Sequence, residues 1–267
     1  MVPKTASSTP RLCGVIHLRP LPSSPRFDGS LGGVIAAAIA DARALVAAGF
    51  DSLMVENFGD APFVPGSVEP VTVAAMTACV REVQAVAPGV AIGINVLRND
   101  ARAALSIAAA TDARMVRINV HSGARVTDQG LLEGRAHDTL RLRRALSLGH
   151  VALWCDVAVK HSAPLADRPL GEEARELCER ALADAVLLTG SATGSPVRVQ
   201  DLLSVRQSVP APVLIASGMD LDNVDLCHHA DGVIVGSSLR ASGRAGDPID
   251  PDRAQAFAEA FQRATAT

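Results

Sequence analysis

The chain has 267 residues, of which 48% are hydrophobic, and a formal net charge of −3. This apolar content is typical of a packed core and too high for a disordered chain, and the length fits one large domain or two small ones. The near-neutral charge and an aromatic content of only 3% argue against nucleic acid as a partner, because they leave neither a basic surface nor stacking platforms for bases. The longest apolar runs, such as Val34 to Ala40, are far shorter than the roughly 20 residues of a transmembrane helix.

Arginine carries almost all of the positive charge. Of the 25 Lys and Arg residues, only Lys4 and Lys160 are lysines. In such a composition Arg is the expected residue wherever a solvated positive charge is all that is needed. Lys160 is therefore a candidate for chemistry that requires an amine, with an ordinary loop lysine as the simpler alternative.

The N-terminal region and the cysteines bear on location. The first 27 residues contain no acidic residue, which is a feature of transit peptides, but they lead directly into an apolar run at Leu12. We therefore expect residues 1–11 to form a flexible terminus and residues 12–267 a single domain.

The five cysteines are odd in number and form no CxxC pair, as expected for reduced, buried thiols in a cytoplasmic protein.

In chain order, short β-branched runs alternate with Ala-rich helical segments. Eight strands are predicted to begin near Leu12, Ser52, Val90, Arg114, Val151, Ala185, Pro212 and Gly232. The predicted helices are Leu31–Ala48, Pro70–Ala87, Ala101–Thr111, Arg135–Leu148, Glu172–Leu182, Val199–Ser208, Leu221–His229 and Pro251–Thr265. Eight strand–helix units in one chain of this length predict a (β/α)₈ TIM barrel, with a doubly wound parallel sheet as the alternative.

The alternation of side chains along each strand predicts which residues face the barrel interior. In the fourth strand Val116, Ile118 and Val120 share the helix-facing side, which leaves the polar residues between them facing inward. Five strands end in inward polar residues by this pattern: His17, Glu56, Asn95, the set Arg117, Asn119 and His121, and Asp156. Burying unpaired charge costs several kcal/mol, so five such residues at one rim favour a functional site over separate structural roles. If this assignment were wrong by one residue, every side chain of that strand would face the opposite side.

The loops after these strands add further candidates. The long loop 122–134 is expected to act as a lid or binding loop, and Lys160 and His161 directly follow the fifth strand. A rim lysine can serve as a Schiff-base nucleophile, a phosphate counter-ion or a proton shuttle. The candidate catalytic residues are Lys160, Asp156, His121, Glu56, His161 and Asp128. The candidate substrate-binding residues are His17, Asn57, Asp60, Asn95, Arg98, Asn99, Arg117 and Asn119.

Small residues end the last three strands. Backbone N–H groups in turns after the seventh and eighth strands form the recurrent phosphate site of such barrels, although Gly also serves simply as a turn former. The candidate phosphate-binding residues are Gly190, Gly194, Ser217, Gly218, Gly236 and Ser237.

Metal and cofactor signals are weak. There is no HxH, HExxH, GxGxxG or Walker motif, and no cofactor is identified. A divalent metal ion held by Glu56, Asp156 or His121 is left open, and a flavin could use the same phosphate site.

Several long segments resemble the BtpA/SgcQ family. They are GVIHLRPLP, VENFGDAPF, GINVLRND, RINVHSGARVTDQGLLEGRAHD, CDVAVKHSAPL, TGSATG and ADGVIVGSSLR. The resemblance extends from Leu12 to Arg240 and implies a barrel of the ribulose-phosphate-binding type. Departures include Ser23-Ser24 in place of a Gly, Ala-Ser-Gly ending the seventh strand in place of Gly-Ser-Gly, and Arg240 in place of a Lys. The last two concern the anion site.

Two functions follow. The family resemblance implies either a factor for photosystem I biogenesis or a role near sugar catabolism. The inward polar residues favour an enzyme, a lyase of the aldolase type, an isomerase or a glycosyl-bond-cleaving enzyme, acting on a small phosphorylated sugar-like or nucleoside-like substrate. In it Lys160 would be nucleophile or electrophile, with His121, Asp156 or Glu56 as acid and base. The alternative is a non-catalytic assembly or stability factor for a membrane complex, which an exposed apolar patch would favour. Fold analogy predicts a homo-oligomer.

Overall fold

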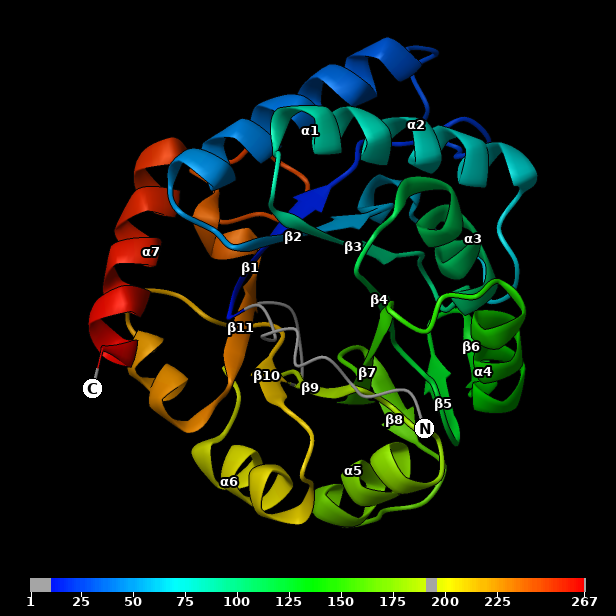
Figure 1. Ribbon diagram of the computed structural model, residues 1–267, viewed down its shortest axis with the longest axis vertical. Coiled ribbons are helices and arrows are strands. Elements are labelled where there is room, and N and C mark those ends of the chain that lie inside the picture. Colours follow the sequence, from blue (N-terminus) through cyan, green and yellow to red (C-terminus); the bar gives the residue numbers. More distant parts are fainter. Residues whose placement is uncertain (1–10, 191–195, 267) are drawn as a thin grey trace.

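Eight parallel strands close into a barrel with helices around it, as predicted (Figure 1). The computed structural model describes residues 11–190 and 196–266. The barrel order is β1-β11-β10-β9-β7-β4-β3-β2. The strands are β1 (Leu12–His17), β2 (Ser52–Glu56), β3 (Ala91–Asn95), β4 (Met115–Ile118), β7 (Ala152–Ala158), β9 (Ala185–Leu188), β10 (Val213–Ile215) and β11 (Gly232–Val235).

Helices connect consecutive barrel strands and cover the outside of the barrel (Figure 1). They are α1 (Leu31–Ala47), α2 (Pro70–Val86), α3 (Ala101–Thr111), α4 (Ala136–Ala145), α5 (Leu170–Glu179), α6 (Val199–Ser208) and α7 (Pro251–Thr265). The expected helix over 221–229 is instead the 3₁₀ segment η2 (Val224–His229). Two further 3₁₀ turns, η1 (Phe58–Asp60) and η3 (Ser237–Leu239), follow β2 and β11.

The expected loop 122–134 contains a hairpin. Strands β5 (Ala124–Thr127) and β6 (Gly130–Glu133) pair antiparallel, and β8 (Ser162–Pro164) joins them on the other side of β5. We call this three-stranded unit the mini-sheet. It lies over the carboxyl ends of β4 and β7 and fixes the two loops that follow these strands to one another.

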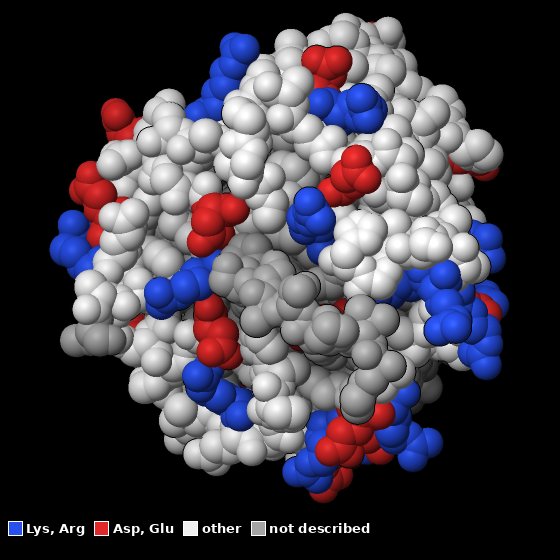
Figure 2. Space-filling view, in the orientation of Figure 1, with Lys and Arg blue, Asp and Glu red and all other residues white. Residues whose placement is uncertain are grey.

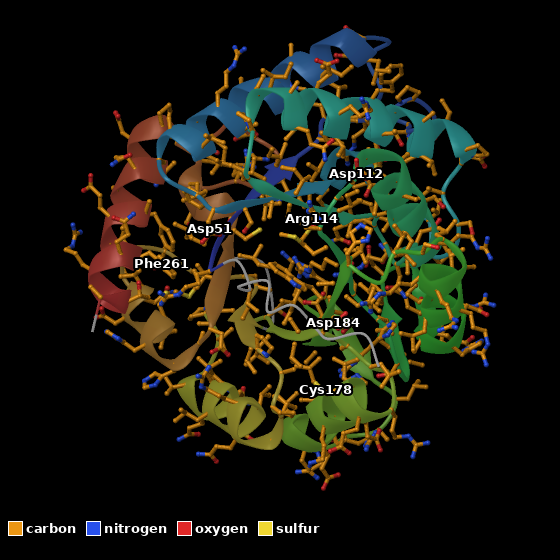
Figure 3. The ribbon with its side chains drawn as sticks, viewed as in Figure 1. Asp51, Asp112, Arg114, Cys178, Asp184 and Phe261 are labelled. Carbon is orange, nitrogen blue, oxygen red and sulfur yellow. The ribbon has the colours of Figure 1, made fainter. Side chains whose placement is uncertain are left out.

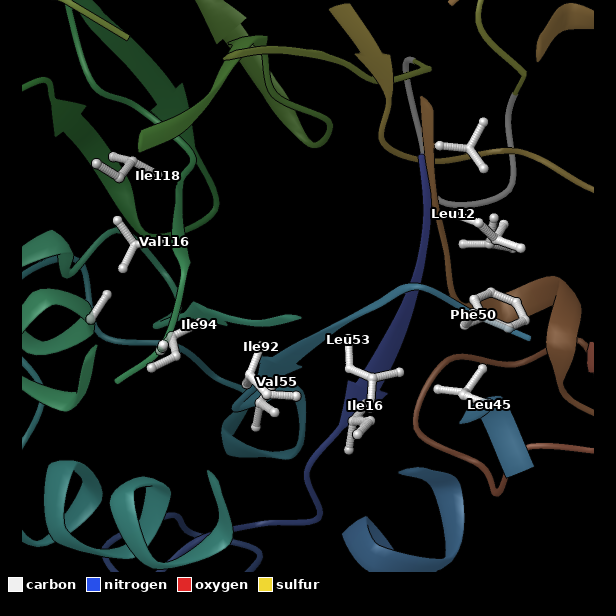
Figure 4. Close-up of a cluster of buried hydrophobic side chains, with 14 of the residues drawn as sticks. Leu12, Ile16, Leu45, Phe50, Leu53, Val55, Ile92, Ile94, Val116 and Ile118 are labelled. Carbon is white, nitrogen blue, oxygen red and sulfur yellow. The ribbon is translucent and has the colours of Figure 1, made fainter. Parts of the chain in front are cut away.

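Two apolar layers show that the predicted alternation of the strands is correct. Inside the barrel, Met54, Met115 and Trp154 pack together with Leu187 and Leu214. Between the strands and the helices lies the larger layer, part of which is drawn in Figure 4, with Ile16, Leu53, Val55, Ile94, Val116 and Ile118 on the helix-facing side. The polar residues of the same strands as Met54, Met115 and Trp154 therefore continue the inward face toward the mouth.

The amino-terminal end of the barrel is held by aspartates that precede strands. Asp51 accepts hydrogen bonds from the backbone N–H groups of Arg11 (3.0 Å) and Leu12 (3.1 Å), so the last residue of the expected flexible terminus is fixed to the barrel. Asp184, labelled with Asp51 in Figure 3, accepts from Leu153 N at 3.0 Å, and Asp231 accepts from Val213 N at 2.8 Å. These contacts join neighbouring strands at the end opposite the site and serve stability.

No helix in the described part of the chain is long and apolar enough to cross a membrane. On the face shown in Figure 2, acidic and basic side chains are interspersed both around the periphery and nearer the centre, without a continuous field of either sign.

Candidate functional site

A buried ion pair spans the carboxyl ends of β4 and β7. Arg117 donates to both oxygens of Asp156, from Nε at 3.1 Å and from a terminal nitrogen at 3.0 Å. Asn119 Nδ2 donates to Asp156 Oδ2 at 2.7 Å. Burial opposes the charge on Arg117, but the Asp156 carboxylate outweighs it and raises the pKa of the guanidinium. Asp156 is therefore held by three hydrogen bonds, which suits a positioning role better than proton transfer.

Glu56 and His17 lie side by side at the ends of β2 and β1. Asn95 Nδ2 donates to Glu56 Oε2 at 2.8 Å, and the other Glu56 oxygen is 3.9 Å from His17 Nε2. Arg240 donates to His17 Nδ1 at 2.9 Å. Burial, reinforced by Arg240 and Lys160, lowers the pKa of His17 well below its ordinary value. The imidazole is thus neutral with Nδ1 as acceptor, which places its proton on Nε2, facing Glu56.

Lys160 follows β7 at the same end of the barrel. Its backbone carbonyl accepts a hydrogen bond from Arg98 at 2.9 Å, so the loop after β3 positions the lysine. Burial lowers the pKa of the Lys160 amine, and Arg117 acts in the same direction, against the carboxylate of Glu56. A larger fraction of the amine is therefore neutral near pH 7 than for a solvated lysine.

The charges at the mouth do not cancel. Within residues 11–190 and 196–266, neither Lys160 nor Arg98 has a carboxylate at ion-pair distance, whereas Arg117 and Asp156 neutralise one another. Glu56 is the buried carboxylate that faces the two remaining cations. The undescribed residues include no Asp or Glu that could alter this balance. The mouth consequently favours an anionic ligand.

One cavity brings this cluster opposite the predicted phosphate turns. Its lining includes the charged and polar residues His17, Glu56, Arg117 and Lys160 together with the turn residues Ser217, Gly218, Gly236 and Ser237. Ser217 Oγ is buried and has no hydrogen-bond partner in the described structure. A buried hydroxyl without a partner is costly and is suited to receiving a ligand oxygen.

The sequence matches a known protein family. The match to the BtpA family extends over residues 9–263. The chain belongs to the BtpA family. The relationship that the motifs indicated is confirmed, and it includes every residue of the cavity.

BtpA-family relatives occur in bacteria, archaea and animals. The photosystem I biogenesis protein BtpA of Synechocystis sp. is 49% identical over 252 residues, which cover 93% of this chain and 86% of that protein. An uncharacterised protein of Thermococcus kodakarensis is 41% identical over 249 residues, covering 93% of this chain and 94% of the relative. One from Caenorhabditis elegans is 31% identical over 260 residues, covering 94% and 92%.

Solved structures share the barrel at low sequence identity. Mycobacterium tuberculosis tryptophan synthase superimposes with a TM-score of 0.62 at 16% identity, covering 98% of this chain and 95% of that one. The (S)-3-O-geranylgeranylglyceryl phosphate synthase of Thermoplasma acidophilum gives a TM-score of 0.60 at 14% identity, covering 97% and 96%. At these identities the likeness shows the fold alone.

Three predicted binding residues of this BtpA-family barrel use their side chains to join loops. Asn57 Oδ1 accepts from Leu97 N at 2.7 Å, and Asn99 exchanges two hydrogen bonds of 2.8 and 2.9 Å with the backbone of Val120. Asp60 accepts from the backbone N–H of Leu21 at 2.8 Å. The loops after β1, β2, β3 and β4 are thereby tied in sequence around the mouth.

Other candidates lie at the edge of the mouth or beyond it. Asp128 is exposed at the tip of the mini-sheet, and His161 is exposed beside Lys160. Burial and the neighbouring Lys160 lower the pKa of His161. Gly190 is buried at the end of β9, and Gly194 is outside the described residues.

Arg240 is the buried residue whose role the sequence did not reveal. Its side chain is fully buried and donates to Val15 O at 3.0 Å as well as to His17. Asp41 of α1 lies 3.4 Å away and balances its charge. The only signal in the sequence was the replacement of the family's more usual Lys at this position.

The described residues contain no candidate metal site. Among the described residues, no group of three His, Cys, Asp or Glu side chains is placed to hold a metal ion. The described cysteines are free, and four of the five are buried.

The prediction that His121 faces the mouth is wrong. Strand β4 ends at Ile118, and the chain then leaves the barrel wall, so strand alternation no longer determines the direction of the side chain. His121 Nε2 lies 2.9 Å from the carbonyl oxygen of Ala181, just beyond α5, and the ring is buried there. This position is among the helices, away from Lys160 and Glu56.

We expect His121 to make the protein sensitive to acid. Burial lowers the pKa of His121, so the unfolded chain binds a proton near its ordinary pKa of about 6.5 that the folded chain does not. Its stabilising contribution is complete above that pH and is lost as the pH falls below it. Urea unfolding between pH 7.5 and 5 should show a shallower pH dependence for His121→Asn than for the wild type. The exposed His150→Asn is the control, and equal slopes for all three proteins would contradict the expectation.

Proposed function

We propose that this BtpA-family barrel is an enzyme that acts on a small phosphorylated substrate at the carboxyl end of its strands. The observation that carries the proposal is the mouth cavity, which two Gly/Ser turns line together with Lys160, a partly desolvated residue that has no carboxylate at ion-pair distance among the described residues. The excess of positive charge and the unpartnered Ser217 hydroxyl both suit a phosphate group.

In the proposed enzyme the charged residues have different roles. Lys160 is the candidate nucleophile toward a substrate carbonyl in its neutral form, which a lowered pKa makes more accessible, and the candidate electrophile in its protonated form. Glu56 is the candidate acid and base, since among the described residues one of its oxygens is engaged only by a contact of 3.9 Å to His17. Asp156 is held by Arg117 and Asn119 and positions the cluster. Aldolase-type cleavage, isomerisation and glycosyl-bond cleavage are all compatible with this arrangement.

Ligand-induced stabilisation tests the proposal. The probes are inorganic phosphate, ribose 5-phosphate and sn-glycerol 1-phosphate, the last being the ligand of one solved neighbour. A ligand at 100 times its Kd stabilises the folded state by about 2.7 kcal/mol, which corresponds to a rise in Tm of roughly 5–10 °C for a chain of this size. We expect this rise with wild type and with Lys4→Arg, and a much smaller one with Lys160→Met and Ser217→Ala.

Lys160→Arg separates charge from chemistry. If it retains ligand binding but no turnover can be measured with any substrate of wild type, Lys160 acts as an amine. If no phosphorylated probe stabilises the wild type, or if Lys160→Met responds like the wild type, the proposed enzyme loses its basis.

A second candidate is a non-catalytic assembly factor for a membrane complex. The name of the Synechocystis relative suggests it, and the mini-sheet presents two paired apolar side chains, Val126 (46% exposed) and Leu131 (50% exposed). If this surface were the functional one, Val126→Ser/Leu131→Ser would abolish function while leaving binding of phosphorylated probes intact.

A further inference from the structure

A second cavity lies beside the barrel mouth, between the mini-sheet and α5. Its volume is about 230 Å³, more than that of the roughly 150 Å³ apolar cavity known to hold benzene. Asn119 and Asp156 form its inner end, where it meets the Arg117 ion pair, and Val157, Leu165 and Leu177 supply apolar walls. The Arg117–Asp156–Asn119 cluster thus lines both cavities, with Arg117 in the mouth cavity and Asn119 and Asp156 in this second cavity.

The inner end of the cavity offers a hydrogen-bond acceptor without a donor. Asn119 is 3% exposed, and its Oδ1 has no partner in the described structure. The orientation of the amide is fixed, because only its NH₂ group can donate to the Asp156 carboxylate at 2.7 Å. Buried acceptors are rarely left unsatisfied, so this oxygen is suited to a ligand that brings an N–H or O–H group.

The charges of the second cavity are balanced, unlike those of the mouth. Arg125 pairs with Glu173, and Arg168 lies 2.9 Å from Glu176. Asp156 is already neutralised by Arg117. An uncharged group with apolar faces fits such walls, whereas a second anion would meet no free cation among the described lining residues.

We propose that the second cavity binds a flat, uncharged ring with an N–H donor, as in a nucleobase, so that the ligand is nucleoside-like rather than a simple sugar phosphate. This inference rests on the proposed function, because the same ligand places its phosphate on the Gly/Ser turns of the mouth. Along the wall, β4 and β7 are three and two strand positions from β10. Strands are spaced about 4.8 Å apart, which gives a separation of roughly 10–14 Å. A ring, a sugar and a phosphate joined in line can bridge such a gap, with the sugar over Lys160 and Glu56.

Binding of matched ligands tests the inference. The probes are ribose 5-phosphate and the four common ribonucleoside 5′-monophosphates, measured by isothermal titration. At least one nucleotide should bind wild type roughly tenfold more tightly than ribose 5-phosphate, or better. Ala166→Trp, at an exposed lining position, should remove that gain and leave ribose 5-phosphate binding unchanged.

The chain offers a matched control in the same segment. Ala163→Trp places the same bulk on an exposed residue of β8 that does not line the cavity, and it should bind like wild type. Ala124→Leu, on β5, is a second way to reduce the cavity if Ala166→Trp fails to fold by circular dichroism.

The outcomes separate this inference from the proposed function. If ribose 5-phosphate binds but no nucleotide binds more tightly, or if the two Trp variants behave alike, the second cavity is not a ring site and the phosphate site stands. If neither the sugar phosphate nor any nucleotide binds wild type, the proposed function fails and this inference fails with it.

Discussion

Arg117→Met should be among the most destabilising single substitutions in the chain. The guanidinium and the Asp156 carboxylate are both buried, with side-chain exposures of 5% and 0%. Removing one member of such a pair leaves a buried charge without its partner, which costs about 3–5 kcal/mol. Urea unfolding of Arg117→Met should show a loss in this range, with Asp156 retaining only the hydrogen bond from Asn119.

The double variant Arg117→Met/Asp156→Asn identifies the cause. Because it removes the uncompensated charge, it should recover a large part of the lost stability relative to Arg117→Met alone. The exposed pair of Arg198 and Asp201 has a comparable distance of 2.7 Å but 80% exposure of the arginine, so Arg198→Met should cost less than about 1 kcal/mol. If the double variant is no more stable than Arg117→Met, lost packing rather than unpaired charge explains the effect.

Strand alternation was sufficient to predict the buried part of the site. His17, Glu56, Asn95, Arg117 and Asp156 face inward because the apolar residues between them, such as Ile94 and Val116, pack against the helices. This alternation is a local pattern, and because both faces of each barrel strand are buried, it can be recognised in a single sequence. It stops being informative where the strand stops, which is why His121 was misplaced three residues beyond the end of β4.

The contacts made by the loop side chains could not be predicted in the same way. Asn57 and Asn99 look like ligand-binding residues in the sequence, but their amides pair with backbone groups of the next loop. Which partner an Asn meets depends on how two loops approach in space, and no local pattern encodes that approach. The same holds for Arg240, whose partners His17 and Asp41 are about 200 residues away along the chain.

Lysine-directed labelling should report directly on the Lys160 amine. In Lys4→Arg, every modified lysine is Lys160, because the chain contains only these two. Burial lowers the pKa of Lys160, so its labelling by acetic anhydride should reach half its maximum at a lower pH than that of a free lysine side chain, whose pKa is about 10.4. Peptide mass spectrometry after labelling over a pH series measures this midpoint.

Substitution of Glu56 tests what sets the pKa of Lys160. Its carboxylate favours the charged amine and opposes burial, so Glu56→Gln in the same background should move the midpoint to still lower pH. A midpoint like that of free lysine would show that the amine is solvated, and a midpoint that is unchanged or higher in Glu56→Gln would show that Glu56 does not favour the charged amine.

Borohydride trapping then distinguishes a nucleophile from a counter-ion. If Lys160 attacks a carbonyl, loss of water gives an imine, and hydride from borohydride reduces it to a stable secondary amine on Lys160. Sugar phosphates that stabilise the protein and carry a carbonyl should yield this adduct with wild type and not with Lys160→Arg. Tight binding without any adduct would instead make the lysine an electrostatic partner of the phosphate. Lys160→Arg should then retain activity, since Arg supplies the same charge.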